Sequence, residues 1–252
     1  MTYDRYCAEI ITQTDILRAA IEGSDLAIRV PTCPEWNLGQ LLGHVGSGHR
    51  WAEEIVRTRA QQPPPDDALR APSSVDGAVD GWLGEGAAAL AAALLAAGPD
   101  AQVWAPLPGK GTPFLARRFA HETLIHRADA TLAVGGEFDA DEDLALDALD
   151  EWMMLASLPQ IFDFQPQQRE LLGPDRTLAF HATDAGADWL VDLTGNLIAC
   201  RPVERKAAVA MRGPLLDLLL VVYGRLPARG EGVRVEGDEQ LLDFWLERVT
   251  FG

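Results

Sequence analysis

The sequence predicts a two-domain protein in which a four-helix bundle precedes a small α+β domain. The length of 252 residues suits one large domain or two modest ones. Long segments with apolar residues at helical spacing fill the chain before Pro166, and short apolar runs bounded by Gly, Asp and Asn follow it. We therefore place an all-α bundle at residues 1–162 and an α+β domain with an antiparallel sheet at residues 163–252.

Each helix of the predicted bundle has a start or stop signal. Asn37 and Gln40 form a capping-box pair at the start of the second helix. The alanine-rich third helix stops at Gly98 and Pro99, and Thr112 is the expected N-cap of the fourth. The four helices are expected at residues 3–23, 38–60, 75–97 and 113–134. A fifth apolar segment, residues 142–158, either covers one end of the bundle or leads into the next domain.

The second domain has the pattern of short strands followed by two helices. Turn signals at residues 184–186 and 194–196 separate the first apolar runs. Strands are expected at residues 177–182, 189–193, 197–200, 207–211 and 232–236, and helices at residues 214–223 and 238–248.

Charge and composition exclude several classes of partner. Lys and Arg number 21 against 38 Asp and Glu, so the formal net charge is −17. A surface of this sign repels phosphate backbones, which argues against nucleic acid and anionic membranes as partners. Small molecules are therefore the expected ligands. The chain is expected to be a monomer or a homodimer.

Cysteine usage and hydropathy predict a cytoplasmic location. Cys7, Cys33 and Cys200 cannot all pair and show no C-x-x-C spacing, which indicates a reducing compartment and no thiolate zinc site. The N-terminus lacks the pattern of a secretory leader. The most apolar stretches, residues 87–97 and 215–223, are about half of the ~20 residues that span a bilayer.

The fourth predicted helix carries the strongest chemical signal. Glu122 and His126 lie one turn apart on the arc that also carries Leu115 and Phe119. A carboxylate on a core-facing arc is costly unless it is paired or bound to a cation. The pair is therefore either part of a metal site inside the bundle or a buried ion pair.

The second predicted helix offers two histidines for such a site. His44 and His49 lie on opposite edges of its apolar arc, so at most one can face the same metal. Periodicity does not choose between them. Gly43 and Gly46 flank His44 and permit a close backbone approach, which favours His44. The alternative is that His44 is a hydrogen-bonded core histidine.

Four segments carry a resemblance to a known family. VPTCPEWNLGQLLGHVGSGHRWA (30–52) and RFAHETLIHRADA (118–130) resemble the mycothiol-dependent maleylpyruvate isomerase family, within the wider DinB-like metal-binding bundles. GPLLDLLLVVYGR (213–225) and VEGDEQLLDFW (235–245) are similar to that family's small, sterol-carrier-like C-terminal domain. The resemblance covers most of the chain.

The resemblance implies a set of site residues and cofactors. His44, Glu122 and His126 would hold a divalent metal, usually zinc, and the open fourth position is typical of a catalytic site. Asp129 would be either an outer partner of a ligand imidazole or a solvated carboxylate near the helix end. Arg225 would be a catalytic residue that grips a substrate carboxylate, or a cation at a helix C-terminus. Mycothiol would be the thiol cofactor.

Three functions are consistent with these residues. The first is a metal-dependent thiol transferase or isomerase that uses mycothiol on a small electrophile. The second is a zinc hydrolase with the same ligands, for which no second carboxylate base is evident in the sequence. The third is a bundle that binds a metal or a ligand without catalysis.

Overall fold

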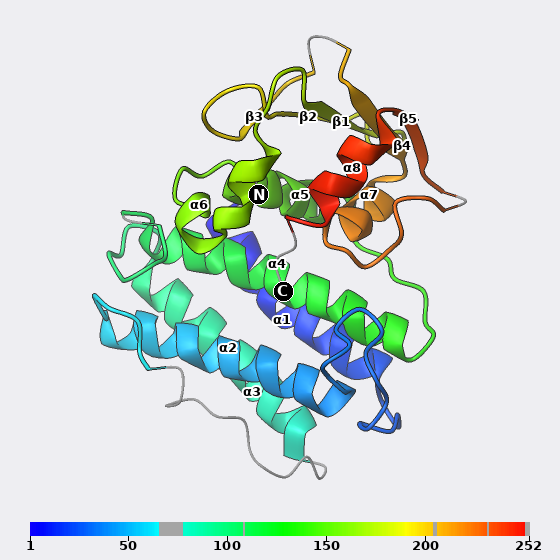
Figure 1. Cartoon of the computed structure of the whole chain (residues 1–252). Helices are drawn as coiled ribbons and strands as arrows, with labels where there is room; N and C mark the ends of the chain where they lie inside the picture. The colour runs from blue at the N-terminus through cyan, green and yellow to red at the C-terminus, as the bar shows by residue number, and fades with distance from the viewer. Residues whose placement is uncertain (66–77, 108, 204–205, 231, 250–252) are drawn as a thin grey trace. The chain divides into compact units, whose positions relative to one another are not determined.

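The computed structural model describes residues 1–65, 78–107, 109–203, 206–230 and 232–249, which form two compact units (Figure 1). The first unit is Met1–Phe138 and the second is Asp139–Gly252. A helical unit followed by a unit with a sheet confirms the predicted fold class.

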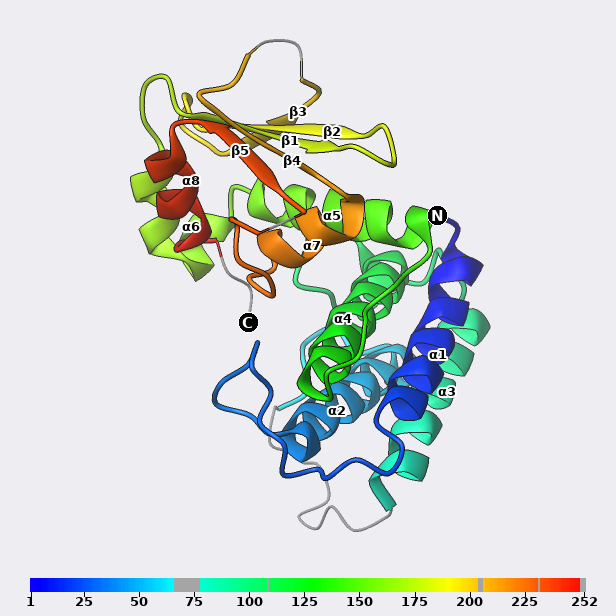
Figure 2. The same ribbon diagram turned by 90° about the vertical axis from the view of Figure 1, so that its right-hand side faces the viewer.

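The first unit is a bundle of four helices, α1 (Tyr3–Ala20), α2 (Leu38–Thr58), α3 (Ala78–Ala97) and α4 (Gly111–Ala133). Helix α1 packs against α3 and α4, and α2 packs against the same two helices (Figures 1 and 2). The predicted start of the third helix at residue 75 lies outside the described residues.

Local hydrogen bonds explain where α2 and α4 begin. The predicted capping box is present, because the Asn37 side chain accepts from the Gln40 N–H and the Gln40 side chain accepts from the Asn37 N–H, both at 2.9 Å. The prediction that Thr112 caps α4 is wrong. Thr112 lies inside the first turn, and its hydroxyl donates to the Gly98 carbonyl at 2.7 Å. Gly111 starts the helix at a φ of +50°, where a Cβ would lie 2.5 Å from the Ala101 carbonyl oxygen.

Helix α3 supplies much of the bundle core. Leu83, Leu90 and Leu94 are fully buried along one face. By length and composition alone, Val79–Ala97 is long and apolar enough to cross a membrane. This apolar segment is longer than residues 87–97, the apolar stretch identified from the sequence. In the structure this helix contributes those leucines to the core shared with its neighbours.

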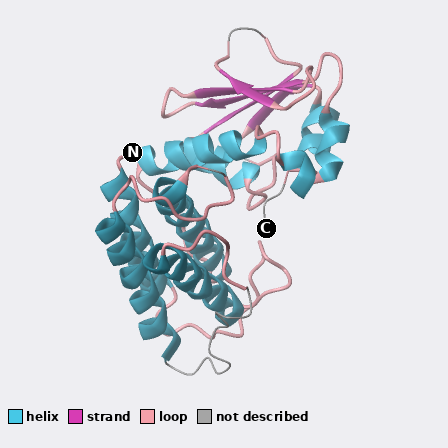
Figure 3. Cartoon of the chain, turned by 90° about the vertical axis from the view of Figure 1, so that its left-hand side faces the viewer, coloured by secondary structure: helices cyan, strands magenta, loops and turns pink. Residues whose placement is uncertain are grey.

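The second unit places helices on one face of a five-stranded sheet (Figures 2 and 3). Strand order is β3-β2-β1-β4-β5, and β1 pairs with β4 in parallel, so the sheet is mixed rather than wholly antiparallel as expected. Its elements are α5 (Glu142–Ala156), α6 (Ile161–Phe164), the 3₁₀ helix η2 (Pro166–Leu171), β1 (Thr177–Ala182), β2 (Asp188–Asp192), β3 (Ala199–Arg201), β4 (Val209–Gly213), α7 (Leu215–Val222), β5 (Arg234–Gly237) and α8 (Glu239–Leu246).

Helix α5 belongs to the second unit. Its fully buried Trp152 has its ring centroid 5.2 Å from that of Trp245 in α8 and 6.5 Å from that of Tyr223 after α7. The compact units therefore divide between Phe138 and Asp139, whereas the sequence pattern placed the change between residues 162 and 163.

Candidate metal centre

The structure brings together the three side chains predicted to hold a metal. Glu122 Oε1 lies 3.4 Å from His44 Nε2 and 3.1 Å from His126 Nε2. One ligand atom from each residue lies within 4.8 Å of the other two. His44 comes from α2, whereas Glu122 and His126 are one turn apart on α4, so the packing of these two helices assembles the cluster.

The two histidines of α2 have different environments. The side chain of His44 is 44% exposed, whereas His49 is only 1% exposed and lies outside the cluster. His49 Nε2 is 2.9 Å from the Thr123 hydroxyl, which itself donates to the Phe119 carbonyl at 2.7 Å. His49 Nε2 is therefore the donor to Thr123, and burial lowers the pKa of His49 to about 3.

Two glycines near His44 lie close to side chains of neighbouring helices. A Cβ on Gly46 would lie 2.2 Å from the Trp82 ring of α3, and a Cβ on Gly48 would lie 3.3 Å from the Phe119 ring of α4. Gly46 therefore permits the close backbone approach expected from the sequence, and the approach is to α3.

Arg118 stabilises the charged form of Glu122. Its guanidinium lies one turn before Glu122 on α4 and donates to Oε2 at 2.5 Å, which leaves Oε1 facing the two histidines. Partial burial on its own would raise the pKa of Glu122. The Arg118 charge and the hydrogen bonds from His126 and His44 outweigh that effect and hold the pKa well below its usual range.

Asp129 is a buried partner of His126 rather than a solvated carboxylate at the helix end. It is fully buried, and its Oδ2 lies 2.9 Å from His126 Nδ1. Burial on its own would lower the pKa of His126, but the hydrogen bonds and charges of Asp129 and Glu122 raise it to about 9. Asp129 therefore orients the imidazole so that Nε2 points toward Glu122 and His44.

Several residues around the cluster were not assigned to it from the sequence. The Trp36 ring centroid lies 4.7 Å from that of His44 and 6.0 Å from that of His126. Thr32 and Cys33, in the same loop, contact Asp129. The one local signal was the spacing of Arg118, four residues before Glu122.

The donor set fits a borderline divalent cation such as zinc. Two imidazoles and one carboxylate are the ligands of many catalytic zinc sites. Tetrahedral bonds of about 2.0–2.1 Å place neighbouring donors about 3.3–3.4 Å apart. The observed separations of 3.4 and 3.1 Å are close to that value. Cys33, His126 and Asp129 form a second group whose ligand atoms lie within 4.8 Å of one another.

Arg225, predicted to be catalytic, belongs to the second unit. It follows α7 and Gly224, and its guanidinium donates to the Tyr223 carbonyl at 2.6 Å. Its backbone N–H donates to the Leu220 carbonyl at 2.7 Å, which is the hydrogen bonding of a helix end. A role for Arg225 in binding substrate stays a prediction.

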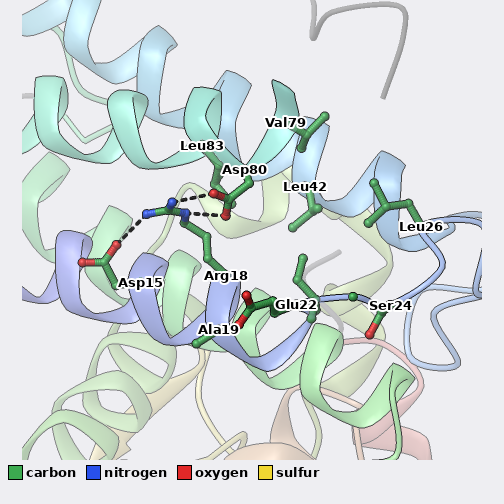
Figure 4. A pocket seen from close by; sticks show the side chains of 12 residues that line it. Asp15, Arg18, Ala19, Glu22, Ser24, Leu26, Leu42, Val79, Asp80 and Leu83 are labelled. Atoms are coloured by element: carbon green, nitrogen blue, oxygen red, sulfur yellow. Dashed lines mark hydrogen bonds and ion pairs between the residues drawn. The ribbon is translucent and has the colours of Figure 1, made fainter. Parts of the chain in front are cut away.

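A hollow of about 470 Å³ in the first unit is separate from the cluster. Figure 4 shows Arg18 of α1 at its edge, paired with Asp80 of α3 and with Asp15. Leu26 and Leu42 contribute to its apolar wall, and none of His44, Glu122 and His126 lines it.

Comparison with solved structures shows which fold the chain shares. A crystal structure of a mycothiol-dependent maleylpyruvate isomerase matches with a TM-score of 0.61 at 15% identity, covering 94% of this chain and 93% of that chain. A histidine-to-alanine mutant of a mycothiol-dependent maleylpyruvate isomerase matches with a TM-score of 0.60 at 14% identity, over 94% and 93% of the two chains. These similarities show a shared two-domain fold. A search of curated proteins found no match.

Family models assign the chain to a family with that fold. The model of the mycothiol maleylpyruvate isomerase N-terminal domain matches residues 7–131, and the model of the MDMPI C-terminal domain matches residues 143–244. The chain therefore belongs to the mycothiol maleylpyruvate isomerase family, which confirms the resemblance seen in the sequence. The gap between the two matches contains the division between the two compact units.

Proposed function

We propose that this protein is a metal-dependent enzyme that uses mycothiol to isomerise, or to attach sulfur to, a small electrophilic substrate. The observation that carries the proposal is the convergence of His44, Glu122 and His126 within one helical bundle of this family. Zinc is the proposed metal because two imidazoles and one carboxylate are ligands it favours, and the set leaves a position open.

A bound divalent ion with an open position would lower the pKa of a coordinated thiol, so that the thiol would lose its proton near neutral pH. The chain's own residues prepare the position. Arg118 holds Oε2 of Glu122 and leaves Oε1 facing the two histidines, and Asp129 holds Nδ1 of His126 so that Nε2 points toward Glu122. Trp36 packs beside both imidazoles and restricts their movement.

The proposed reaction proceeds by addition and elimination. The mycothiol thiolate forms a C–S bond to one carbon of a conjugated double bond, and the π electron pair moves onto the activating group. Rotation about the resulting single bond, return of the electron pair and cleavage of the C–S bond give the geometric isomer and free thiolate. If the adduct instead takes up a proton and keeps the C–S bond, the product is a thioether.

The hydrogen bonds of two carboxylates, Asp129 and Glu122, disfavour hydrolysis at the same ligands. Activation of water in such sites commonly uses a second carboxylate as general base. Asp129 is buried and accepts from Thr32 and His126, and Glu122 accepts from Arg118. Both carboxylates are therefore already hydrogen-bonded to other described residues.

The test is a thiol-dependence assay on untagged, zinc-loaded protein. Maleylpyruvate is the first substrate to try, with other activated cis alkenes as a panel, and the trans isomer and the thioether are both quantified. We expect turnover only with mycothiol, loss of turnover in His126→Ala, and retention of most turnover in the control His49→Gln. Turnover at the same rate with and without mycothiol would contradict the proposal. A metal-loaded protein that neither binds mycothiol nor converts any substrate of the panel would also contradict it.

Arg225 enters the proposal only through the family resemblance. A guanidinium that grips a substrate carboxylate contributes chiefly to binding. Arg225→Ala should therefore raise KM more than it lowers kcat, and Arg225→Lys should restore only part of the loss because lysine lacks the bidentate fork. Unchanged kinetics in Arg225→Ala would remove this residue from the site.

A further inference from the structure

The loop between α1 and α2 contacts Asp129, the carboxylate that holds Nδ1 of His126. We infer that Thr32 and Cys33 are positioning residues: they hold Asp129, and through it they set the orientation of His126 and the affinity of the site for its metal. This inference rests on the proposed metal site, and its test separates the failure of one from the failure of the other.

Thr32, Cys33 and His126 each bring a donor to Asp129. The Thr32 hydroxyl donates to Oδ1 at 2.6 Å, and the Cys33 thiol donates to Oδ2 at 3.6 Å. His126 Nδ1 lies 2.9 Å from the same Oδ2. Asp129 is fully buried, so these contacts replace water around its carboxylate.

The loop that presents Thr32 and Cys33 is held in shape by its own backbone. The Val30 N–H donates to the Trp36 carbonyl at 3.0 Å, the Cys33 N–H to the Val30 carbonyl at 3.1 Å and the Trp36 N–H to the Cys33 carbonyl at 2.8 Å. The two side-chain donors therefore reach α4 from a closed loop. The same loop places the Trp36 ring beside His44 and His126.

The direction of these hydrogen bonds defines how Thr32 and Cys33 act on His126 through Asp129. An ionised carboxylate only accepts, so His126 donates to Asp129 from Nδ1 and directs Nε2 toward Glu122. Without the Thr32 and Cys33 donors, the Asp129 carboxylate loses two contacts that fix its rotation. The imidazole would then be held less firmly in the orientation that a metal requires.

A direct role for Cys33 is the competing explanation. Cys33, His126 and Asp129 themselves place one ligand atom each within 4.8 Å of one another. Cobalt(II) distinguishes the two roles, because a thiolate ligand produces an intense near-ultraviolet charge-transfer band whereas nitrogen and oxygen ligands alone do not.

The experiment titrates cobalt(II) and zinc(II) into metal-free wild-type protein and four variants. Thr32→Val and Cys33→Ala remove a donor, and Thr32→Ser and Cys33→Ser are the matched controls that keep one. We expect the affinity of Thr32→Val to fall on the order of 10-fold, within the range known for outer partners of metal ligands. Thr32→Ser should bind within about 3-fold of wild type, a difference well below that range. Circular dichroism confirms that each variant is folded.

A second readout does not depend on metal. The His126 Nδ1 proton, hydrogen-bonded to buried Asp129, should give a slowly exchanging NMR resonance in the metal-free protein, and Thr32→Val should broaden or shift it. If wild type binds no metal but this resonance responds as expected, the proposed metal site fails and the positioning role stands. A folded Thr32→Val protein with an unchanged resonance and unchanged affinity would overturn the inference. A thiolate band lost in Cys33→Ser would overturn it for Cys33.

Discussion

Helices α3 and α4 lie in the same bundle and have similar lengths, but they bury different chemistry. Helix α3 buries an apolar face that includes Leu83, Leu90 and Leu94, and α4 buries Thr123, His126 and Asp129 among its apolar residues. Each unpaired buried polar group costs on the order of 1–3 kcal/mol. The contrast teaches that α3 contributes mainly packing, whereas α4 buries polar groups that need partners from other elements and therefore carries the candidate site.

The largest expected effect is the loss of a ligand from α4. His126→Ala should weaken zinc binding by more than about 1,000-fold, because removal of a ligand exceeds the 10–100-fold cost typical of an outer partner. Chelator competition measures the affinity. His49→Gln on α2 is the matched control, since His49 contacts Thr123 and lies outside the cluster. Equal affinities for the two variants would contradict the placement of His126 inside the cluster and of His49 outside it.

The corresponding change on α3 should affect stability and leave the site unchanged. Leu90 is fully buried, so Leu90→Ala should lower the free energy of unfolding by about 3 kcal/mol. Urea unfolding measures that loss, and zinc affinity at a temperature where the variant stays folded should match wild type. A large fall in zinc affinity without partial unfolding would show that the α3 core also shapes the site.

His49 should make the stability of the bundle dependent on pH. Its pKa is about 3 in the folded state against an ordinary value of 6.5. The unfolded chain therefore binds a proton that the folded chain does not, and stability falls as pH drops below about 6.5, at up to about 1.4 kcal/mol per pH unit until about pH 3. Unfolding curves at pH 7, 5.5 and 4.5 in the presence of a chelator should show a steeper decline for wild type than for His49→Gln. Parallel profiles would contradict this account of His49.

The smallest expected effect lies on the outer surface of the same bundle. Arg18 of α1 pairs with Asp80 of α3 at 2.6 Å, with 30% and 60% of the two side chains exposed (Figure 4). Exposed pairs contribute little, so Asp80→Asn should change the free energy of unfolding by less than about 1 kcal/mol. Thermal unfolding at low and high salt checks the value, and a change as large as that of Leu90→Ala would place this pair among the main contacts between α1 and α3.

Local patterns were sufficient for the existence of the four bundle helices and for two of the three residues of the cluster. The Asn37 capping box and the spacing of Glu122 and His126 are properties of neighbouring residues, so the sequence alone revealed them. The choice between His44 and His49 depends on which one meets Thr123 of α4, and that is a tertiary contact. The helical pattern alone left both positions open.

Other features depend on residues far apart in the chain. Thr32 meets Asp129 across 97 positions, and no local pattern indicates that contact. The parallel pairing of β1 with β4 was missed because a short apolar strand has the same pattern in either orientation. The place of α5 was ambiguous because its apolar face suits either unit, and the packing of Trp152 against Trp245 decides it.

X-ray absorption at the zinc edge of the loaded, untagged protein tests the central claim most directly. Zinc–nitrogen and zinc–oxygen bonds of about 2.0–2.2 Å are distinguishable from a zinc–sulfur bond of about 2.3 Å. Our account predicts one zinc per chain in a shell of nitrogen and oxygen only, with the imidazole contribution reduced when His44 is replaced by alanine. A sulfur atom in the shell before any thiol is added, or a protein that takes up no zinc, would contradict it.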